Sequence, residues 1–600
     1  MDKNKYRQIW NLDSIFQSIK KSNQFSNHIQ DIEQGLGKLD GDIAATSISS
    51  VEDADHILNI LMKIDSIKLK LSQASSFITC LLAQNPSDQE ASVFQGRVTK
   101  LNSKYGVTLT NFQAILASTS LEIWIDVLES EVLKDFNFIL AEWREEGETS
   151  LTSNEKAILS KLSIDGYHAW GQLYQTLMSN LEIEIQLEGK PQKYSIGQAL
   201  NLRAHSNEEL RKLGHEKLEL KWSEQKETFA KVLNHIAGFR LQLYNFQGID
   251  DVLEEPLRKN RMKKQTLEAM WSVVSKNKNA FAEYLNRKGK ITGQEKMQSY
   301  NFWANFETNS QKIHYDDAID LVKGSFRKFG KQLEAFVTTA IEEGWIEAEN
   351  RPKKSAAAFC AGFPMSEESR IFMTFDGTMK SILTLAHELG HAFHNTAMNG
   401  ISSLNRQYPL CIAETASFFA EMIVLDVAIE TAESKSEKIS LLDEKLKRSV
   451  MNFMNIHSRF LFEQNFYEER KKGLVSTQRL NELMQEAILD GYRDSLDNVS
   501  VYTWLWTPHF YITDAPFYNF PYTFGYLLTY SLYEKAKEIG PDFENIYIQL
   551  LRDSGKMPIE ELILKHLNED ITNEAFWEKG MKLCVQDVEL FLELTAYERV

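Results

Sequence analysis

The sequence predicts a mainly α-helical protein, and three observations support this fold class. Only 11 Pro and 28 Gly occur among 600 residues, which argues against a β-sandwich or a linker-rich array. Apolar residues recur at intervals of three and four over long stretches, for example 207–248 and 316–344, as on one face of a helix. The content of 43% hydrophobic and 25% charged residues is ordinary for a soluble globular protein. We therefore expect a large helical protein with several subdomains.

One alternating segment separates two helical regions. Residues 181–195 alternate apolar and polar side chains around a Gly-Lys-Pro turn, which predicts a β-hairpin. We expect residues 1–180 to form an amino-terminal helical lobe and residues 196–600 to form the catalytic region. A second β-favouring run, 370–375, is either an exposed edge strand that pairs with a peptide backbone or an ordinary strand within a sheet.

Charge, hydropathy and cysteine content exclude several classes of protein. A net charge of -17 argues against nucleic acid as a partner. The amino end lacks the apolar core of a signal peptide, and no run approaches the roughly 18 apolar residues of a membrane span, so we expect no membrane partner and a cytoplasmic location. The four cysteines are widely scattered, which predicts free thiols.

Residues 387–391 read His-Glu-Leu-Gly-His and carry the clearest functional signal. We expect a helix that begins near 376–378 and ends at 399–400, with the motif near its middle. At about 100° per residue, His387 and His391 lie about 40° apart, and Glu388 lies about 60° from His391. Two imidazoles and a carboxylate on one helical face are typical of a zinc hydrolase, although cobalt or manganese could occupy the same ligands.

A catalytic zinc site needs a third protein ligand, and the apolar segment 410–425 offers two carboxylates. Glu414 and Glu421 lie seven residues apart, on one side of a predicted helix, where a carboxylate is costly to bury unless it is paired or bound to metal. We predict Glu414 as the ligand and Glu421 as an acceptor for the free N–H of a ligand histidine. The alternative is that either carboxylate reaches solvent at a helix edge. His394 is predicted either to support the ligands from behind or to be structural, because a fourth ligand would close the site to water, and Cys411 is predicted to pack in the core.

These motifs resemble the oligoendopeptidase F branch of the thimet oligopeptidase family. The resemblance rests on Phe-Asp-Gly-Thr at 375–378, the zinc-binding pattern H-E-x-G-H-x-x-H at 387–394 and the pattern E-x-x-S at 414–417. It extends to the Trp-x-Leu segment at 10–16 and to residues 240–257. It implies a two-lobed helical metallopeptidase whose lobes enclose a deep central channel, with a small β-sheet beside the zinc helix and one Zn²⁺ on the channel floor. Such a channel would admit short unfolded oligopeptides as substrates.

The same resemblance implies further catalytic residues near the carboxyl end. Members of this family use a histidine and tyrosines there to hydrogen-bond the substrate carbonyl and stabilise the oxyanion. His509, Tyr518 and Tyr522 are the matching positions, although the residues at 512–515 leave the register open. Aromatic core packing is the alternative for any one tyrosine.

Together these residues predict a zinc metalloendopeptidase of oligopeptides. Zinc held by His387, His391 and Glu414 would activate water, and Glu388 would act as the general base. Two alternatives remain: a zinc carboxypeptidase or dipeptidyl carboxypeptidase on the same frame, and a noncatalytic peptide-binding protein. The sequence does not give the cleavage-site preference or the oligomeric state.

Overall fold

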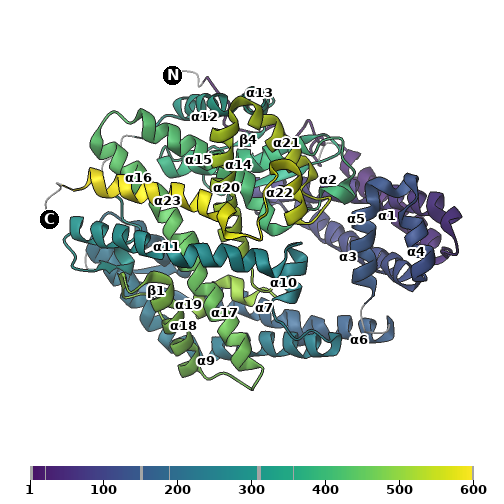
Figure 1. Cartoon of the computed structure of the whole chain (residues 1–600), viewed down its shortest axis with the longest axis horizontal. Helices are drawn as coiled ribbons and strands as arrows, with labels where there is room; N and C mark the ends of the chain where they lie inside the picture. The colour runs from purple at the N-terminus through teal and green to yellow at the C-terminus, as the bar shows by residue number, and fades with distance from the viewer. Residues whose placement is uncertain are drawn as a thin grey trace. The chain divides into compact units, whose positions relative to one another are not determined.

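The chain folds into two compact units, each assembled from three separate stretches of sequence. The computed structural model describes residues 5–19, 22–148, 153–187, 190–306, 312–355 and 357–596. Unit 1 comprises Met1–Thr149, Gln311–Val424 and Glu538–Asn568, and unit 2 comprises Ser150–Ser310, Leu425–Lys537 and Glu569–Val600. Both are built mainly of helices with small sheets, which confirms the predicted fold class (Figure 1). The expected lobes, 1–180 and 196–600, divide the chain differently and stay a prediction.

Unit 1 holds a group of amino-terminal helices, a small sheet and the helix with the metal-binding motif. Its helices are α1 (Gln24–Ala44), α2 (Ala54–Gln84), α3 (Gln89–Ser118), α4 (Leu121–Leu128), α5 (Asn137–Gly147), α12 (Tyr315–Phe329), α13 (Lys331–Glu342), α14 (Met379–Ala397), α21 (Phe543–Asp553) and α22 (Ile559–Leu567). Helix α15 (Leu410–Thr431) begins in this unit.

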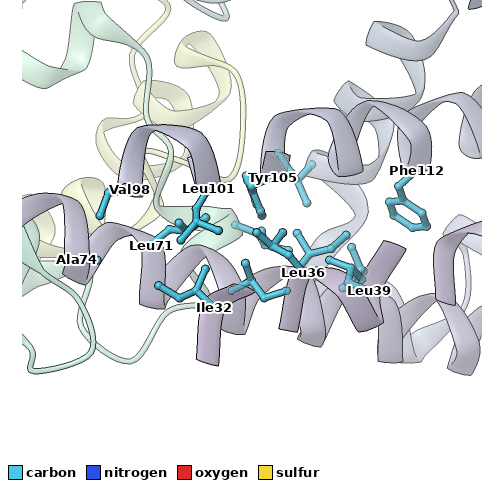
Figure 2. Close-up of a cluster of buried hydrophobic side chains, with 14 of the residues drawn as sticks. Ile32, Leu36, Leu39, Leu71, Ala74, Val98, Leu101, Tyr105 and Phe112 are labelled. Atoms are coloured by element: carbon cyan, nitrogen blue, oxygen red, sulfur yellow. The ribbon is translucent and has the colours of Figure 1, made fainter. Parts of the chain in front are cut away.

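The core of the amino-terminal helices follows from their sequence period. In α1 the buried residues recur every three or four positions, so that one side of the helix is apolar. Leu36 and Leu39 from this side meet Leu71 of α2 and Phe112 of α3 in one apolar cluster (Figure 2). Burial of each large apolar side chain contributes about 1.5 to 3 kcal/mol relative to exposure. Packing of this cluster therefore holds α1, α2 and α3 together.

A three-stranded sheet in unit 1 has the order β4-β6-β5. The strands are β4 (Ile346–Glu347), β5 (Phe359–Phe363) and β6 (Glu368–Phe372). β6 pairs in parallel with β4 and antiparallel with β5. Of the run 370–375, residues up to Phe372 belong to a strand, which lies in the centre of the sheet and not at an edge. The outer strand nearest to it in sequence is β5.

The helical pattern at 316–344 forms two helices where one was predicted. α12 ends at Phe329 and α13 starts at Lys331, with Gly330 extended between them. The carboxylate of Glu544 lies against Gly330, where a Cβ would clash with it, and Oε1 accepts the Leu333 N–H at 2.8 Å. A side chain more than 200 positions away in the sequence thus caps the second helix.

Unit 2 is built of helices that range from four to 40 residues in length. They are α6 (Ser153–Ser163), α7 (Ala169–Asn180), α8 (Ile196–Asn201), α9 (Glu208–Gln247), α10 (Glu254–Lys259), α11 (Lys264–Ile291), α16 (Lys435–Val450), α17 (Ile456–Arg470), α18 (Thr477–Tyr492), α19 (Thr503–Trp506), α20 (Phe520–Ile539) and α23 (Glu574–Leu594). α11 and α23 lie side by side, and α17 packs on α18 (Figure 1).

The sequence predictions for unit 2 agree with its local structure. α9 is capped by the Asn207 side chain and ends at Gly248, which has a positive φ of 73°, so the predicted helix 207–248 is confirmed. The predicted hairpin is formed by β1 (Glu182–Leu187) and β2 (Lys190–Ser195), while Gly189 of its expected turn lies outside the described residues. Two short strands, β3 (Met297–Gln298) and β7 (Leu496–Asp497), pair in parallel.

Among the described residues, no helix combines the length and the apolar character that crossing a membrane requires.

Candidate metal centre

The motif helix α14 starts and ends where the sequence predicted. Thr378 is its amino-terminal cap, and the Thr378 side chain accepts the Ser381 N–H at 3.2 Å. Gly377 and Gly400, which flank the helix, have positive φ values of 79° and 74°. These local signals place the motif in the middle of a regular helix.

α14 packs on the small sheet through Asn395. Cys360 and Gly362 of β5 face this side chain: its Nδ2 lies 3.8 Å from Cys360 Sγ, and a Cβ at position 362 would lie 3.0 Å from it. Asn395 also donates to Ser369 Oγ at 3.2 Å. The absence of a side chain at position 362 thus lets the sheet approach the helix that carries the motif.

A second glycine brings the next helix close to α14. A Cβ at Gly390 would lie 2.4 Å from the carbonyl oxygen of Ala416 and 2.6 Å from Cα of Ser417, both in α15. Such distances are too short for any side chain, so only glycine permits this approach. The close contact places Glu414 of α15 beside the two motif histidines.

His387, His391 and Glu414 form the group of potential metal ligands within the described part of the chain. Their ligand atoms all lie within 4.8 Å of one another. Glu414 Oε2 is 3.5 Å from His387 Nε2 and 3.8 Å from His391 Nε2, and the two Nε2 atoms are 3.2 Å apart. Ser417 Oγ donates to Glu414 Oε2 at 3.0 Å and fixes the orientation of that carboxylate. The structure thus brings together the three residues predicted as ligands.

The hydrogen bonds around the histidines favour a bound cation. His387 Nδ1 lies 2.6 Å from Glu421 Oε1; because a carboxylate only accepts, Nδ1 carries a proton and Nε2 is the nitrogen that faces the other ligands. His391 also hydrogen-bonds the backbone of Ala413. Two imidazole nitrogens and a carboxylate oxygen that face one point are the donor set that Zn²⁺ prefers. The residues present therefore fit a zinc ion.

Electrostatics at this point also favour positive charge. Burial lowers the pKa of His387, but the hydrogen bond to Glu421 and the charges of Glu421, Glu414 and Glu388 outweigh it and raise this pKa to about 9. Burial and the neighbouring His387 lower the pKa of His391 to about 3. The surrounding carboxylates thus stabilise one cation among the ligands.

Glu388 lies next to the ligands and is available for chemistry. Its side chain is buried, and Oε2 has no hydrogen-bond partner among the described residues. Burial raises its pKa to about 7, which the charges of Glu414 and Glu421 reinforce and that of His387 opposes. A buried carboxylate with an unused oxygen is a suitable proton acceptor.

Two nearby residues have structural environments, as predicted. His394 is fully buried, stacks on Tyr408 and contacts Leu551 O and Ser554 Oγ through Nε2 at 3.2 and 3.0 Å. Cys411 is buried in the core. Neither belongs to the ligand group.

His509, Tyr518 and Tyr522 form a second cluster, which lies in unit 2. The His509 ring stacks on Tyr518 with centroids 5.3 Å apart, and Tyr522 lies 5.8 Å from His509 and 6.0 Å from Tyr518. All three side chains are partly exposed. Burial and the charge of Arg459 lower the pKa of His509 to about 4, so its imidazole is neutral at pH 7. The cluster therefore brings one imidazole and two phenol groups together.

Sequence reasoning missed the buried charged residues behind this cluster. Arg459 of α17 lies with Nη1 3.4 Å from both His509 Nδ1 and Asn519 Oδ1, and Glu463 one turn later accepts the Phe517 N–H. The sequence signal that could have revealed them is that Arg459 and Glu463, four residues apart, flank the apolar run Phe460–Phe462.

Comparisons with known proteins agree with these observations. The family model described as Peptidase family M3 matches residues 201–583, and the model described as Oligopeptidase F matches residues 116–182. The chain is similar to an oligoendopeptidase F homolog of Lactococcus lactis subsp. lactis, with 22% identity over 85% of this chain and 86% of that protein. It is also similar to oligopeptidase PepF of Bacillus subtilis, with 21% identity over 98% of this chain and 87% of the relative.

The fold has counterparts among solved structures. Oligoendopeptidase-F from Enterococcus faecium superposes with a TM-score of 0.69 at 17% identity, covering 98% of this chain and 100% of that one.

Proposed function

Because the chain belongs to peptidase family M3 and is therefore a peptidase, we propose that it is a zinc metalloendopeptidase of short, unfolded oligopeptides. The observation that carries the proposal is the convergence of His387, His391 and Glu414 beside the buried carboxylate of Glu388. The names of the relatives, oligoendopeptidase F and oligopeptidase PepF, support cleavage of internal bonds in oligopeptides.

The ligand residues would hold the ion by two imidazole nitrogens and one carboxylate oxygen. Glu421 would keep the His387 ring in the tautomer whose Nε2 is unprotonated, and Ser417 would orient Glu414. When bound, zinc would supply a Lewis acid that lowers the pKa of water and polarises the peptide carbonyl. Three protein ligands leave one position open for solvent or substrate.

Glu388 would move the protons of the reaction. Its free Oε2 accepts a proton from the attacking water, and the resulting carboxylic acid donates that proton to the leaving amine nitrogen. Burial of Glu388 raises its pKa to about 7, close to the pH at which a group can both accept and return a proton.

His509, Tyr518 and Tyr522 would donate hydrogen bonds to the substrate carbonyl oxygen as negative charge develops there. A neutral imidazole and two phenols donate without carrying a charge that must be buried. Their mutual packing, with ring centroids 5.3 to 6.0 Å apart, supports a common role.

The peptide would lie along β5, the outer strand of the small sheet. Main-chain pairing of this kind gives affinity with few sequence requirements. Ser76 of α2 already donates to the Gly362 carbonyl oxygen at 2.7 Å, so the peptide would pair with the half-buried residues Phe359 and Cys360.

A digest of a mixed peptide library tests the proposal. The wild-type protein should bind about one zinc per chain and cleave end-blocked peptides at internal bonds, and a chelator should abolish cleavage. Glu388→Gln should keep the zinc and lose at least about 1,000-fold in kcat, because the amide cannot accept the proton. Glu342→Gln, an exposed position on α13, is the matched control and should leave both unchanged.

Three outcomes would contradict parts of this assignment. Cleavage restricted to peptides with a free carboxyl terminus would favour a carboxypeptidase. Zinc binding without chelator-sensitive cleavage would favour a noncatalytic peptide-binding protein. Full turnover by Glu388→Gln would exclude Glu388 as the general base.

A further inference from the structure

The segment 512–519 joins the two parts of the His509 cluster and has no regular secondary structure. It follows the short 3₁₀ helix Pro508–Tyr511, which carries His509, and precedes α20, which carries Tyr522. A connection that lacks regular backbone hydrogen bonds is held in its conformation by the side chains that bind it. In this segment such side chains hold both ends.

Buried residues of the preceding helices hold the first end. Arg240 of α9 is 2% exposed, and its Nη2 donates to the carbonyl oxygens of Ile512 and Thr513 at 3.1 and 3.0 Å. The Tyr167 hydroxyl donates to the same Thr513 oxygen at 2.8 Å. Hydrogen bonds from a charged donor are about twice as strong as neutral ones, so these two carbonyl groups are firmly placed.

Glu463 of α17 holds the second end at a strained residue. Phe517 has a φ of 54°, in the left-handed region that a bulky side chain rarely adopts because its backbone is strained there. Its N–H donates to Glu463 Oε1 at 2.9 Å, and its ring packs against Phe460 and Tyr467 with centroids 5.9 and 5.6 Å away. The hydrogen bond and the aromatic packing together offset the strain.

Burial of Glu463 costs desolvation free energy, which is unfavourable for a carboxylate whose only role is to stabilise the fold. The residue is 3% exposed, Oε2 lacks a hydrogen-bond partner, and no ion pair of Glu463 occurs within the described ranges. Replacement by an apolar residue would remove this desolvation cost. The carboxylate is better explained by the conformation that it imposes on Phe517.

Phe517 precedes the cluster tyrosine directly. Tyr518 stacks on His509 with an interplanar angle of 13°, and Asn519 contacts Arg459. A change of Phe517 from the left-handed to the common right-handed region would redirect the chain at this point and turn the Tyr518 ring away from His509.

We infer that Glu463 is a positioning residue for peptide hydrolysis, which holds Phe517 in its left-handed conformation and thereby keeps Tyr518 stacked on His509. The inference rests on the proposed function, since it assigns Glu463 a role through Tyr518. Glu463 itself touches the backbone of this segment and not the substrate.

Three substitutions of Glu463 separate positioning from general stability. Glu463→Gln keeps an oxygen that accepts the Phe517 N–H. Glu463→Ala removes the acceptor, and Glu463→Asp keeps the carboxyl group but withdraws it by one methylene group. Asp443→Asn is the destabilising control: Asp443 is also a buried carboxylate of unit 2, but it binds Lys288 and Tyr284 and not segment 512–519.

Two measurements are made on each zinc-loaded, full-length variant: steady-state kinetics with one peptide, and hydrogen exchange of the segment 512–519. Glu463→Ala and Glu463→Asp should lose about 10- to 100-fold in kcat with KM changed less than about threefold, because a misplaced donor acts mainly on the transition state. Exchange in the segment should rise at least tenfold. Glu463→Gln should have nearly the wild-type kcat and nearly the wild-type hydrogen exchange of the segment. Asp443→Asn should have a lower melting temperature, but its kcat and the exchange of its segment 512–519 should match the wild type.

The possible failures are distinguishable. Wild-type kcat or unchanged exchange in both Glu463→Ala and Glu463→Asp would overturn the positioning role in an active enzyme. An equal loss of kcat in Asp443→Asn would show that the Glu463 variants lose activity only because they are less stable. Absence of chelator-sensitive cleavage by the wild-type protein would instead overturn the proposed function, and exchange would still report whether Glu463 holds the segment.

Discussion

His387 and Glu421 are joined by a hydrogen bond of 2.6 Å from Nδ1 to Oε1, between adjacent helices of unit 1. This contact decides which imidazole nitrogen faces the other ligands.

Glu421→Ala should therefore weaken zinc binding about 10- to 100-fold, and Glu421→Gln should weaken it less, because its amide oxygen still accepts the hydrogen bond from His387 Nδ1. Competition with a calibrated zinc chelator measures both. Glu430→Gln, exposed on the same helix, is the control, and equal affinities in all four proteins would refute the role of Glu421.

Gly390→Ala tests the close approach of α14 and α15. Alanine at an ordinary helix position stabilises by about 0.5 to 1 kcal/mol relative to glycine. At position 390, however, the new Cβ would lie 2.4 Å from the Ala416 carbonyl oxygen, so we expect destabilisation of about 1 to 3 kcal/mol and weaker zinc binding. Gly37→Ala in α1, where nothing lies within 4 Å of the Cβ, should be neutral or stabilising. Calorimetry and zinc titration compare the unfolding free energy and the zinc affinity of the two variants. Similar values for both would show that α15 can shift away from α14 without cost.

The stability of the protein should depend on pH through Glu463. Burial raises its pKa from 4.5 to about 7 in the folded protein, against its bond to Phe517 and the charge of Arg240. The folded state therefore keeps a proton that the unfolded state has lost, and stability should fall by up to about 3 kcal/mol as pH rises from about 4.5 to about 7. Glu463→Gln should flatten the melting temperature over this range. Glu468→Gln, exposed on the same helix, should not, and identical pH profiles for all three proteins would contradict the protonation of Glu463.

Leu36→Ala tests the amino-terminal core of Figure 2. Leu36 is fully buried, so the substitution should cost about 2 to 5 kcal/mol of unfolding free energy. The folded variant should still bind zinc normally, because Leu36 belongs to the helical cluster and not to the ligand helices. Val93→Ala in α3, at an exposed position, should change stability by less than about 0.5 kcal/mol. A comparable loss at both positions would argue against this cluster as the core.

Local features of the sequence were sufficient for the helix of the metal centre. Its cap at Thr378, its terminal Gly400 and the spacing of His387 and His391 act within a few residues, so they are visible in the chain itself. Glu414 was predictable because a carboxylate in an apolar helix requires a partner.

Features set by distant contacts were not predictable from local patterns. The break at Gly330 depends on Glu544, and the central position of β6 depends on a strand of only two residues, Ile346–Glu347. Nothing in the sequence around Phe517 signals a positive φ, because Phe is not a residue that favours it. The roles of His509, Tyr518 and Tyr522 and a cytoplasmic location stay predictions.

The composition of unit 1 has a consequence for synthesis of the protein on the ribosome. His394, at the end of the metal-binding helix, is packed by Leu551 and Ser554, which belong to the last of the three stretches of this unit. At 5 to 20 residues per second, roughly 8 to 30 s separate the synthesis of His394 from that of Leu551 and Ser554. During this interval the apolar side of the helix lacks its final partner and stays exposed until the third stretch of unit 1 has been made.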